Sequence, residues 1–230
     1  MSVVLEEIPV VTVDGPGGAG KGTVAAMLAA ALDWHLLDSG ALYRIVAVAA
    51  QDRGILLTSA NALAIADLAH TLEIEFQGET IFVDGADVTL TVRTEESGAV
   101  ASLAAAMPEV RACVLDVQRK FRRPPGLVAD GRDMGTVVFV DAGLKVFLDA
   151  SAEERARRRY KQLKNKGLSV SLPDLLAQLK ERDARDRGRS VAPLQPAEDA
   201  LLIDSTSMTI EAVFDQVMVW LRQRGMHSLP

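Results

Sequence analysis

The chain has a single cysteine, Cys113, among its 230 residues. One cysteine excludes a disulfide within the chain and suits a reducing compartment. No apolar run approaches the ~20 residues that a membrane-spanning helix needs, and the N-terminus lacks the early basic residues of a secretory signal. We therefore expect a cytoplasmic protein that does not bind a membrane.

Histidine is also scarce, and the three histidines show no spacing typical of a metal site. We therefore expect no metal ligands in the chain itself. Internal repeats, linkers and low-complexity segments are absent as well. With this length and a hydrophobic fraction of 49%, we expect one globular domain over residues 1–230.

The net charge of −6 is unevenly distributed along the chain. Residues 151–190 contain 12 Lys and Arg against 6 Asp and Glu, whereas the remainder contains 13 against 25. A basic segment in an acidic protein indicates a local anionic ligand and not a nucleic-acid surface.

The N-terminal part contains a strand, a glycine-rich loop and a helix in succession. Residues 10–13 are all β-branched and mostly apolar, and the alanine-rich residues 24–32 favour a helix. The glycines between them let backbone N–H groups converge on a phosphate chain, which Lys21 can also reach. The usual pattern of such a phosphate-binding loop (P-loop) has Ser or Thr directly after the lysine. Here Gly22 intervenes before Thr23, which leaves a direct bond from Thr23 to Mg²⁺ undecided.

Further apolar segments predict strands at 34–37, 127–129, 145–148 and 200–205, with helices between them. This alternation predicts an α/β fold with a five-stranded parallel sheet flanked by helices. Residues 71–92 instead alternate apolar and polar residues around turns at Gly78 and Gly85, which predicts a small antiparallel β insert, including a strand over residues 87–92.

Two pairs of polar residues follow the predicted strands 34–37 and 127–129, namely Ser39 with Arg44 and Arg132 with Asp133. The carboxyl ends of parallel strands are where α/β sheets bind ligands. A phosphate loop together with a second arginine-rich site suggests transfer of a phosphoryl group between two phosphorylated ligands. A nucleoside monophosphate has a second pKa near ~6, so no dedicated general base is needed at neutral pH.

A basic helix near the end of the chain adds a third group of charges. The spacing i, i+3, i+4, i+7 places Arg182, Arg185, Asp186 and Arg189 on one helical face. The pattern predicts that these four residues address one site together, as part of a helical lid over phosphates at about residues 153–190.

Four motifs, at residues 14–23, 37–44, 130–136 and 182–187, closely resemble those of the bacterial cytidylate kinase family. The resemblance extends nearly from end to end and includes the β insert, which is similar to the insert of the bacterial enzymes. Gly17 departs from the family, which often has Ser there. A loop that binds phosphate through its backbone should tolerate this change.

The resemblance implies phosphoryl transfer from ATP to CMP or dCMP, with Mg²⁺ bound mainly through the ATP phosphates. It implies a nucleoside-monophosphate-binding subdomain at about residues 40–105, including the insert at 71–92. The implied ATP-binding residues are Gly15, Pro16, Gly17, Gly18, Ala19, Gly20, Lys21, Gly22 and Thr23. The implied catalytic residues are Lys21, Arg132, Arg182 and Arg189.

The resemblance also implies a CMP site. Its phosphate would be bound by Ser39, Arg44, Arg132 and Arg189, and its ribose or adjoining phosphates by Arg182 and Asp186. Its base would be read by Ser102, Arg111 and Asp133. The chemistry is suitable, because a carboxylate accepts from the N4 amino group of cytosine, whereas uracil presents an oxygen at that position.

Two alternatives remain open. The chain could phosphorylate UMP or AMP, or it could be a nucleotide-binding switch without transfer activity. GTP-binding switches carry the motif N-K-x-D, but here Asn165, Lys166 and Gly167 are followed by Leu168. No feature requires a protein partner, and we expect a monomer.

Overall fold

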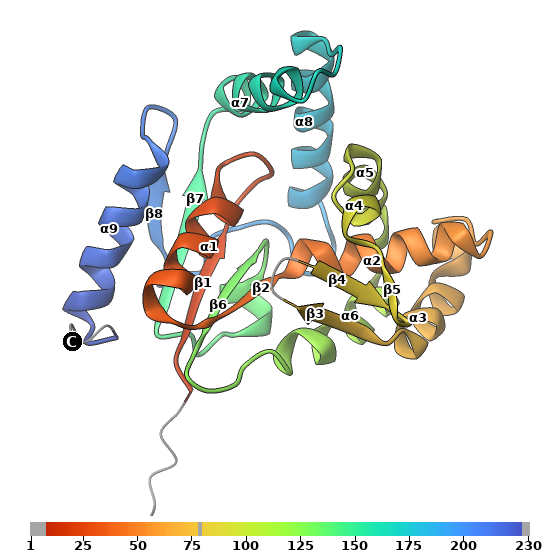
Figure 1. Cartoon of the computed structure of the whole chain (residues 1–230), viewed down its shortest axis with the longest axis horizontal. Helices are drawn as coiled ribbons and strands as arrows, with labels where there is room; N and C mark the ends of the chain where they lie inside the picture. The colour runs from red at the N-terminus through yellow and green to blue at the C-terminus, as the bar shows by residue number, and fades with distance from the viewer. Residues whose placement is uncertain (1–7, 78–79, 227–230) are drawn as a thin grey trace, which may run out of the picture. The chain divides into compact units, whose positions relative to one another are not determined.

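The computed structural model of the chain describes residues 8–77 and 80–226 (Figure 1). The expected turn at Gly78 lies outside the described residues, and so do residues 1–7, which are part of the N-terminus expected to lack a secretory signal. The described chain divides into two compact units. Unit 1 comprises the residues up to Leu37 and from Arg119 onward, and unit 2 is Asp38–Gln118.

Unit 1 contains a five-stranded sheet in the order β2-β6-β1-β7-β8, which confirms the predicted α/β class. The central strand β1 pairs in parallel with β6 and β7, and β7 pairs in parallel with β8. In chain order the elements are β1 (Val10–Asp14), α1 (Lys21–Leu32), β2 (His35–Asp38), β6 (Leu127–Gly131), η2 (Met134–Val138), β7 (Leu144–Asp149), α7 (Ala152–Asn165), α8 (Leu172–Arg187), β8 (Leu201–Asp204) and α9 (Ile210–Gln223).

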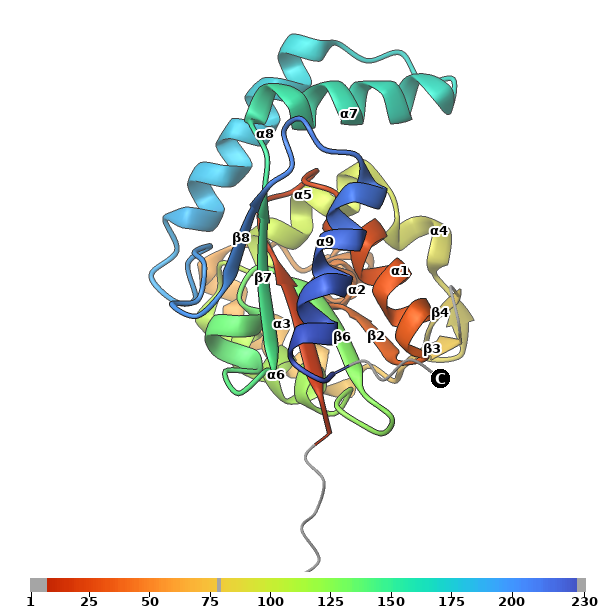
Figure 2. The ribbon, with the colours of Figure 1, turned by 90° about the vertical axis from the view of Figure 1, so that its left-hand side faces the viewer.

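The core of unit 1 explains why the sheet forms where it does. All five residues of β1 are buried, as expected for a central parallel strand. Helices α1 and α9 cover one face of the sheet (Figure 2), and their apolar side chains form one cluster with those of the strands. The small side chains of α1 allow this helix to pack closely against the sheet. The register pairs Asp14 with Gly131, so the loops after β1 and β6 leave the sheet at the same edge.

Unit 2 is mainly helical and contains the predicted antiparallel insert. Strands β3, β4 and β5 form a three-stranded antiparallel sheet. One face of this sheet contributes Ile81 to a buried cluster with Ala41, Ile45 and Val92. In chain order the elements are α2 (Ser39–Asp52), η1 (Ser59–Asn61), α3 (Ala62–Thr71), β3 (Ile74–Gln77), β4 (Thr80–Val83), β5 (Ala86–Asp87), α4 (Thr89–Val92), α5 (Glu95–Ala104) and α6 (Pro108–Arg119).

The third predicted strand of the insert, over residues 87–92, is wrong beyond Asp87. Residues Thr89–Val92 form the short helix α4. The carboxylate of Asp87 accepts a hydrogen bond from the N–H of Thr89 at 2.9 Å, which starts a turn. The hydroxyl of Thr89 then accepts from the N–H of Ile81 at 2.8 Å, in place of a backbone carbonyl of a continuing strand. Val92 is buried in this helix, as it would be in a strand with one buried face. The alternation of apolar and polar residues therefore does not distinguish a helix from a strand here.

Across residues 8–77 and 80–226, no single helix is both long enough and apolar enough to cross a membrane. The helices Glu96–Ala104 and Pro108–Arg119 reach that length and composition only when taken together, and they are bent by 105° relative to each other.

Candidate active site

The loop between β1 and α1 has the conformation that phosphate binding requires. Gly15, Gly18 and Gly20 adopt positive φ angles of 145°, 82° and 99°. A Cβ atom on Gly15 would lie 2.0 Å from the carbonyl oxygen of Leu148, so only glycine fits there. Among the described residues, no side chain caps the first turn of α1. The N–H groups at the start of α1 are therefore available to an anion, which the helix dipole also attracts.

Lys21 is the cation of this loop. Its side chain is 5% exposed, and its Nζ donates to the carbonyl oxygen of Pro16 at 2.9 Å. The Nζ also lies 3.9 Å from Oδ1 of Asp130 at the end of β6. Burial, together with the charges of Arg132 and Arg182, lowers the pKa of Lys21 to about 8, although Asp130 opposes this effect. Arg132 and Arg182 thus repel the Lys21 ammonium, and a ligand with several negative charges would relieve that repulsion.

Three of the predicted arginines converge on one buried carboxylate. Asp186 is 1% exposed, and it bonds to Nε of Arg132 at 3.2 Å and to Nη2 of Arg189 at 2.5 Å. Nε of Arg182 lies 4.0 Å from the same carboxylate. Burial alone would raise the pKa of Asp186, but Arg132, Arg189 and Arg182 outweigh it and hold that pKa below its usual value. Asp186 therefore stays ionised and orients the three guanidinium groups.

This arginine cluster lies directly beside the phosphate loop. A Cβ atom on Gly17 would lie 3.5 Å from Nη2 of Arg132 and 3.8 Å from Cζ of Arg182. A small residue at position 17 thus leaves space for both guanidinium groups next to the loop. The structure brings the loop, Lys21 and the arginines together within unit 1, in an arrangement suited to neutralising charge on a transferring phosphoryl group.

Arg185 does not join this cluster, contrary to the prediction from helical spacing. Its Nη2 donates to Oε1 of Glu181 at 2.7 Å, one turn earlier on α8. Helix α8 ends at Arg187, so Arg189 reaches Asp186 from beyond the helix rather than from a continuing helical face. The i, i+4 carboxylate of Glu181 engages Arg185 away from the other arginines.

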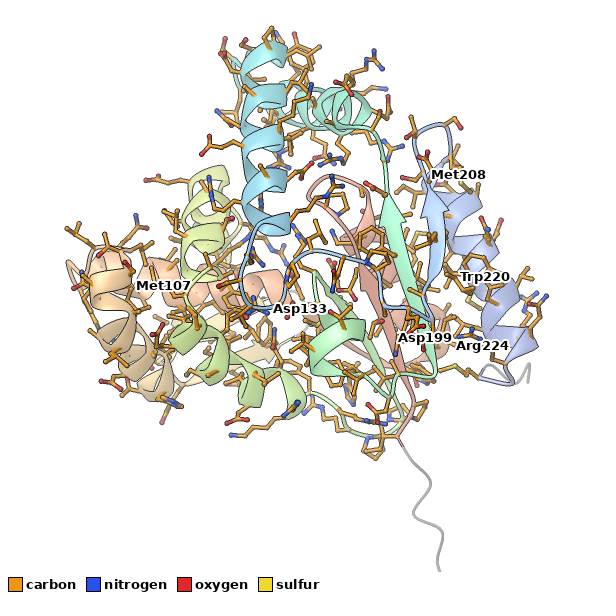
Figure 3. All side chains as sticks on the ribbon, turned by 180° about the vertical axis from the view of Figure 1, so that it is seen from behind. Met107, Asp133, Asp199, Met208, Trp220 and Arg224 are labelled. Atoms are coloured by element: carbon orange, nitrogen blue, oxygen red, sulfur yellow. The ribbon has the colours of Figure 1, made fainter. Side chains whose placement is uncertain are left out.

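Asp133 lies in the loop that follows β6, and Figure 3 shows it beside the carboxyl end of α8. Asp133 is 2% exposed. The backbone N–H groups of Met134 and Gly135 both donate to the carboxylate of Asp14 at 2.8 Å, which fixes the turn directly after Asp133. Burial raises the pKa of Asp14 to about 7, and the charge of Asp133 adds to this increase. The two hydrogen bonds act in the opposite direction but do not outweigh burial. A buried carboxylate on a fixed turn is suited to reading a polar ligand group.

Unit 2 holds the other four predicted residues. Ser39, at the start of α2, is buried, and its hydroxyl accepts from Nε2 of Gln118 at 2.7 Å. On the same helix, Nη1 of Arg44 donates to the carbonyl oxygen of Val92 at 3.2 Å. Both side chains are thus held by contacts within unit 2, and Gln118 determines how the Ser39 hydroxyl is oriented.

Arg111 and Ser102 lie on neighbouring helices of unit 2. Arg111, on α6, is 7% exposed, and its Nη1 donates to the carbonyl oxygen of Ala105 at 3.2 Å. Its guanidinium lies 5.7 Å from the ring centre of Tyr43, within range of a cation–π interaction. Ser102, on α5, is 2% exposed.

Several residues that hold these groups in place were not among the predicted site residues. In unit 2, Gln118 lies two helical turns after Arg111, and this spacing is a signal that could have revealed it. In unit 1, Nη1 of Arg155 donates to the carbonyl oxygen of Gly17 at 3.0 Å. The hydroxyl of Ser205 donates to the carbonyl oxygen of Ala19 at 3.2 Å. Nothing in the sequence separates Arg155 from the other arginines of its helix.

Asp130 is the oxygen donor that fits a magnesium ion accompanying a nucleotide. Its Oδ1 lies near Lys21, and a Cβ atom on Gly22 would lie 3.3 Å from its Oδ2. Mg²⁺ is typically held by one or two carboxylates, waters and substrate phosphates. A carboxylate beside the start of α1 meets that requirement, and the hydroxyl of Thr23 is a second oxygen close by in the chain.

Comparison with known proteins agrees with this geometry. Residues 11–223 match the family described as cytidylate kinase. A cytidylate kinase of Aeromonas salmonicida (strain A449) is 56% identical over 220 residues, covering 94% of this chain and 95% of its own. A cytidylate kinase of Pseudomonas paraeruginosa is 55% identical over 224 residues, covering 95% and 97%. A solved shikimate kinase of Acinetobacter baumannii, at 17% identity and a TM-score of 0.46 over 96% of both chains, is too distant to add to this. The chain belongs to the cytidylate kinase family.

Proposed function

We propose that this chain transfers the γ-phosphoryl group of ATP to CMP or dCMP, forming ADP and CDP or dCDP. The observation that carries this proposal is the buried Lys21 beside Arg132 and Arg182 at the phosphate loop. Membership of the cytidylate kinase family supports CMP as the acceptor.

In the proposed reaction, the loop from Gly15 to Thr23 binds the ATP phosphates through its N–H groups and Lys21. An oxygen of the CMP phosphate forms a bond to the γ-phosphorus, and the bond from that phosphorus to the bridging oxygen of ADP breaks. Lys21, Arg132, Arg182 and Arg189 neutralise charge on the transferring group. The second pKa of a phosphate monoester is near ~6, so the acceptor is already ionised at neutral pH and no side chain needs to remove a proton.

We assign the CMP contacts by the part of the ligand that they bind. The hydroxyl of Ser39 and the guanidinium of Arg44 bind the phosphate, together with Arg132 and Arg189. Arg182 and Asp186 contact the ribose or adjoining phosphates. Asp133 accepts from the N4 amino group of cytosine, Arg111 donates to O2 and N3, and Ser102 completes the contacts to the base. The hydrogen bond from Gln118 to Ser39 and the bonds from Arg132 and Arg189 to Asp186 support these roles, because they hold the side chains in place before ligand binds.

The proposal extends to the cofactor and to moving parts. Mg²⁺ binds mainly through the ATP phosphates, with Asp130 near it, and when bound it supplies charge neutralisation and orientation of the phosphates. Residues 153–190 act as a lid that excludes water, and residues 40–105 bind the nucleoside monophosphate. We further propose that the enzyme acts as a cytoplasmic monomer, which size-exclusion chromatography with light scattering would test.

The deciding experiment measures ADP formation from Mg·ATP with CMP, dCMP, UMP and AMP as separate acceptors. We expect strong turnover with CMP and dCMP and little with UMP or AMP, because a buried polar group left unpaired discriminates by several orders of magnitude. Turnover led by UMP or AMP would retain phosphoryl transfer but overturn the assignment of Asp133 and Arg111. Absence of acceptor-dependent turnover would favour a nucleotide-binding protein without transfer activity.

A further inference from the structure

Arg155 is a buried arginine that connects three parts of unit 1. It lies in the first turns of α7 and is only 2% exposed. Its Nε donates to the carbonyl oxygen of Ala150 at 2.9 Å, just after β7. Its Nη1 donates to the carbonyl oxygen of Gly17 at 3.0 Å, and both of its Nη atoms bond to the carboxylate of Asp183 on α8. One guanidinium thus joins the end of β7, the phosphate loop and the second helix of the proposed lid.

The guanidinium geometry makes this arrangement specific. Its five N–H donors lie in one plane at fixed angles, so a bidentate carboxylate on one edge determines where the remaining donors point. Asp183, itself 7% exposed, occupies that edge, with Oδ1 at 3.1 Å from Nη1. The remaining direction of Nη1 is toward Gly17. A lysine could make one of these contacts but not the set, because an ammonium is a point charge on a flexible stem.

The contact with Gly17 bears on how the loop binds phosphates. Carbonyl oxygens repel an anion, so a phosphate-binding loop must turn them away and present its N–H groups. Arg155 donates to the carbonyl oxygen of Gly17 and so holds it in a fixed direction. Arg158 and Ser205 do the same for the carbonyl oxygen of Ala19, with the Ser205 hydroxyl at 3.2 Å. These carbonyls are therefore fixed from the side of α7 and β8.

The same link sets the position of an arginine that the proposed reaction uses. Asp183 follows Arg182 directly on α8, and Arg182 lies beside Gly17, where a Cβ atom would be 3.8 Å from its Cζ. The bond between Arg155 and Asp183 thus fixes α8 relative to the loop at the point where Arg182 approaches it. A shift of about 1 Å at a reacting group can cost on the order of 100-fold in rate.

We propose that Arg155 and Asp183 are positioning residues for phosphoryl transfer: Asp183 orients the guanidinium of Arg155, which turns the Gly17 carbonyl away from bound phosphates and places Arg182 against the loop. Neither residue touches the reacting atoms. The inference rests on the proposed function in so far as the reaction is phosphoryl transfer from ATP, and it is independent of which acceptor is used.

The test compares Arg155→Lys and Asp183→Asn with the control Lys180→Ala. Lys180 forms an ion pair with Glu153 at 2.9 Å, which also joins α8 to α7, but both side chains are more than half exposed. Each variant is measured for its melting temperature, for Mg·ADP affinity by titration calorimetry, and for kcat and the separate KM values of ATP and CMP. Calorimetry without an acceptor keeps the positioning role testable even if CMP proves not to be the acceptor.

We expect Arg155→Lys to weaken Mg·ADP binding about tenfold, in line with loss of a charge-assisted hydrogen bond, and to lower kcat by a further factor on the order of ten to 100. The KM of CMP should change less than about twofold, because the pair acts on the ATP loop. Asp183→Asn should show the same pattern in smaller degree, and the double variant should be no worse than Arg155→Lys, since both residues act through one contact. Lys180→Ala should match the wild type.

Three results would overturn the proposal. One is a folded Arg155→Lys or Asp183→Asn variant with unchanged Mg·ADP affinity and kcat. Another is equal loss with Lys180→Ala, which would mean that any link between α7 and α8 has the same effect. The third is a proportional rise in both KM values. If Arg155→Lys does not fold, the nearly isosteric Asp183→Asn decides alone.

Discussion

Raising the pH across the pKa of Lys21 gives a direct test of the electrostatics of the phosphate loop. In the absence of nucleotide, burial and the charges of Arg132 and Arg182 lower the pKa of this lysine from 10.5 to about 8. At 1.36 kcal/mol per pH unit, keeping the proton in the empty site costs about 3 kcal/mol relative to water. The phosphates of a bound nucleotide reverse this balance, because negative charge close to Nζ favours the protonated form.

Nucleotide binding should therefore take up a proton above pH 8. With a pKa of about 8, half of the lysine side chains are neutral at pH 8 and about nine tenths at pH 9. Binding should then consume about 0.5 proton at pH 8 and about 0.9 at pH 9, and the affinity should fall by up to about tenfold per pH unit. The same shift makes the empty protein more stable as the pH rises from about 8 toward 10.5, because only the unfolded chain still holds the proton there.

The assay is titration calorimetry of Mg·ADP at pH 7, 8 and 9 in buffers with different ionisation enthalpies. The slope of observed heat against buffer ionisation enthalpy gives the number of protons taken up. The phosphates of ADP are ionised over this range, so they do not contribute at pH 8 and above. Lys21→Arg is the matched control, because an arginine keeps its proton throughout. Zero uptake by the wild type at pH 9, or equal uptake by Lys21→Arg, would refute the reasoning.

Three further predictions concern single substitutions. Asp133→Ala should lower CMP turnover by on the order of 100-fold or more, since a base-reading group is lost, while Mg·ADP affinity stays within twofold; an equal loss of both would make Asp133 structural. Arg44→Ala should raise the KM of CMP or lower kcat by about tenfold at an unchanged melting temperature, and unaltered kinetics would contradict its assignment. Gly15→Ala should destabilise the fold by more than about 2 kcal/mol, because its Cβ would meet the Leu148 carbonyl at 2.0 Å with φ at +145°. The control Gly85→Ala, where a Cβ meets nothing within 4 Å and φ is +79°, should cost only about 1 kcal/mol in thermal denaturation.

Features carried by neighbouring residues were predictable from the sequence. The strand, loop and helix from Val10 to Leu32 form one continuous segment, so composition and turn chemistry were enough to identify it. The cap of α7 is equally local, because Ser151 accepts from the N–H of Glu154, three residues later, at 3.2 Å. The five strands were found because buried parallel strands are short, apolar and rich in β-branched residues.

The sequence was misleading where a side-chain hydrogen bond overrides the residue pattern. Alternating residues at 87–92 suited a strand, but the hydrogen bonds of Asp87 and Thr89 started a helix instead. Regular helical spacing placed Arg185 with the other arginines, but Glu181 pairs with it on α8. In both cases a side-chain hydrogen bond changed the outcome, and α8 also ends at Arg187, before Arg189.

By itself, the sequence determined the phosphate loop, the parallel sheet and the charged residue types of the candidate site. Only the tertiary structure decided which of those charges meet. Asp14 receives its hydrogen bonds from residues about 120 positions later, Arg132 pairs with Asp186 across 54 positions, and Arg155 reaches Gly17 across 138. These pairings depend on strand order and on where each helix packs, and periodicity within a segment contains no information about either. The burial that brings such charges together also lowers the pKa of Lys21 and raises that of Asp14. The electrostatic character of the site is therefore a property of the folded chain.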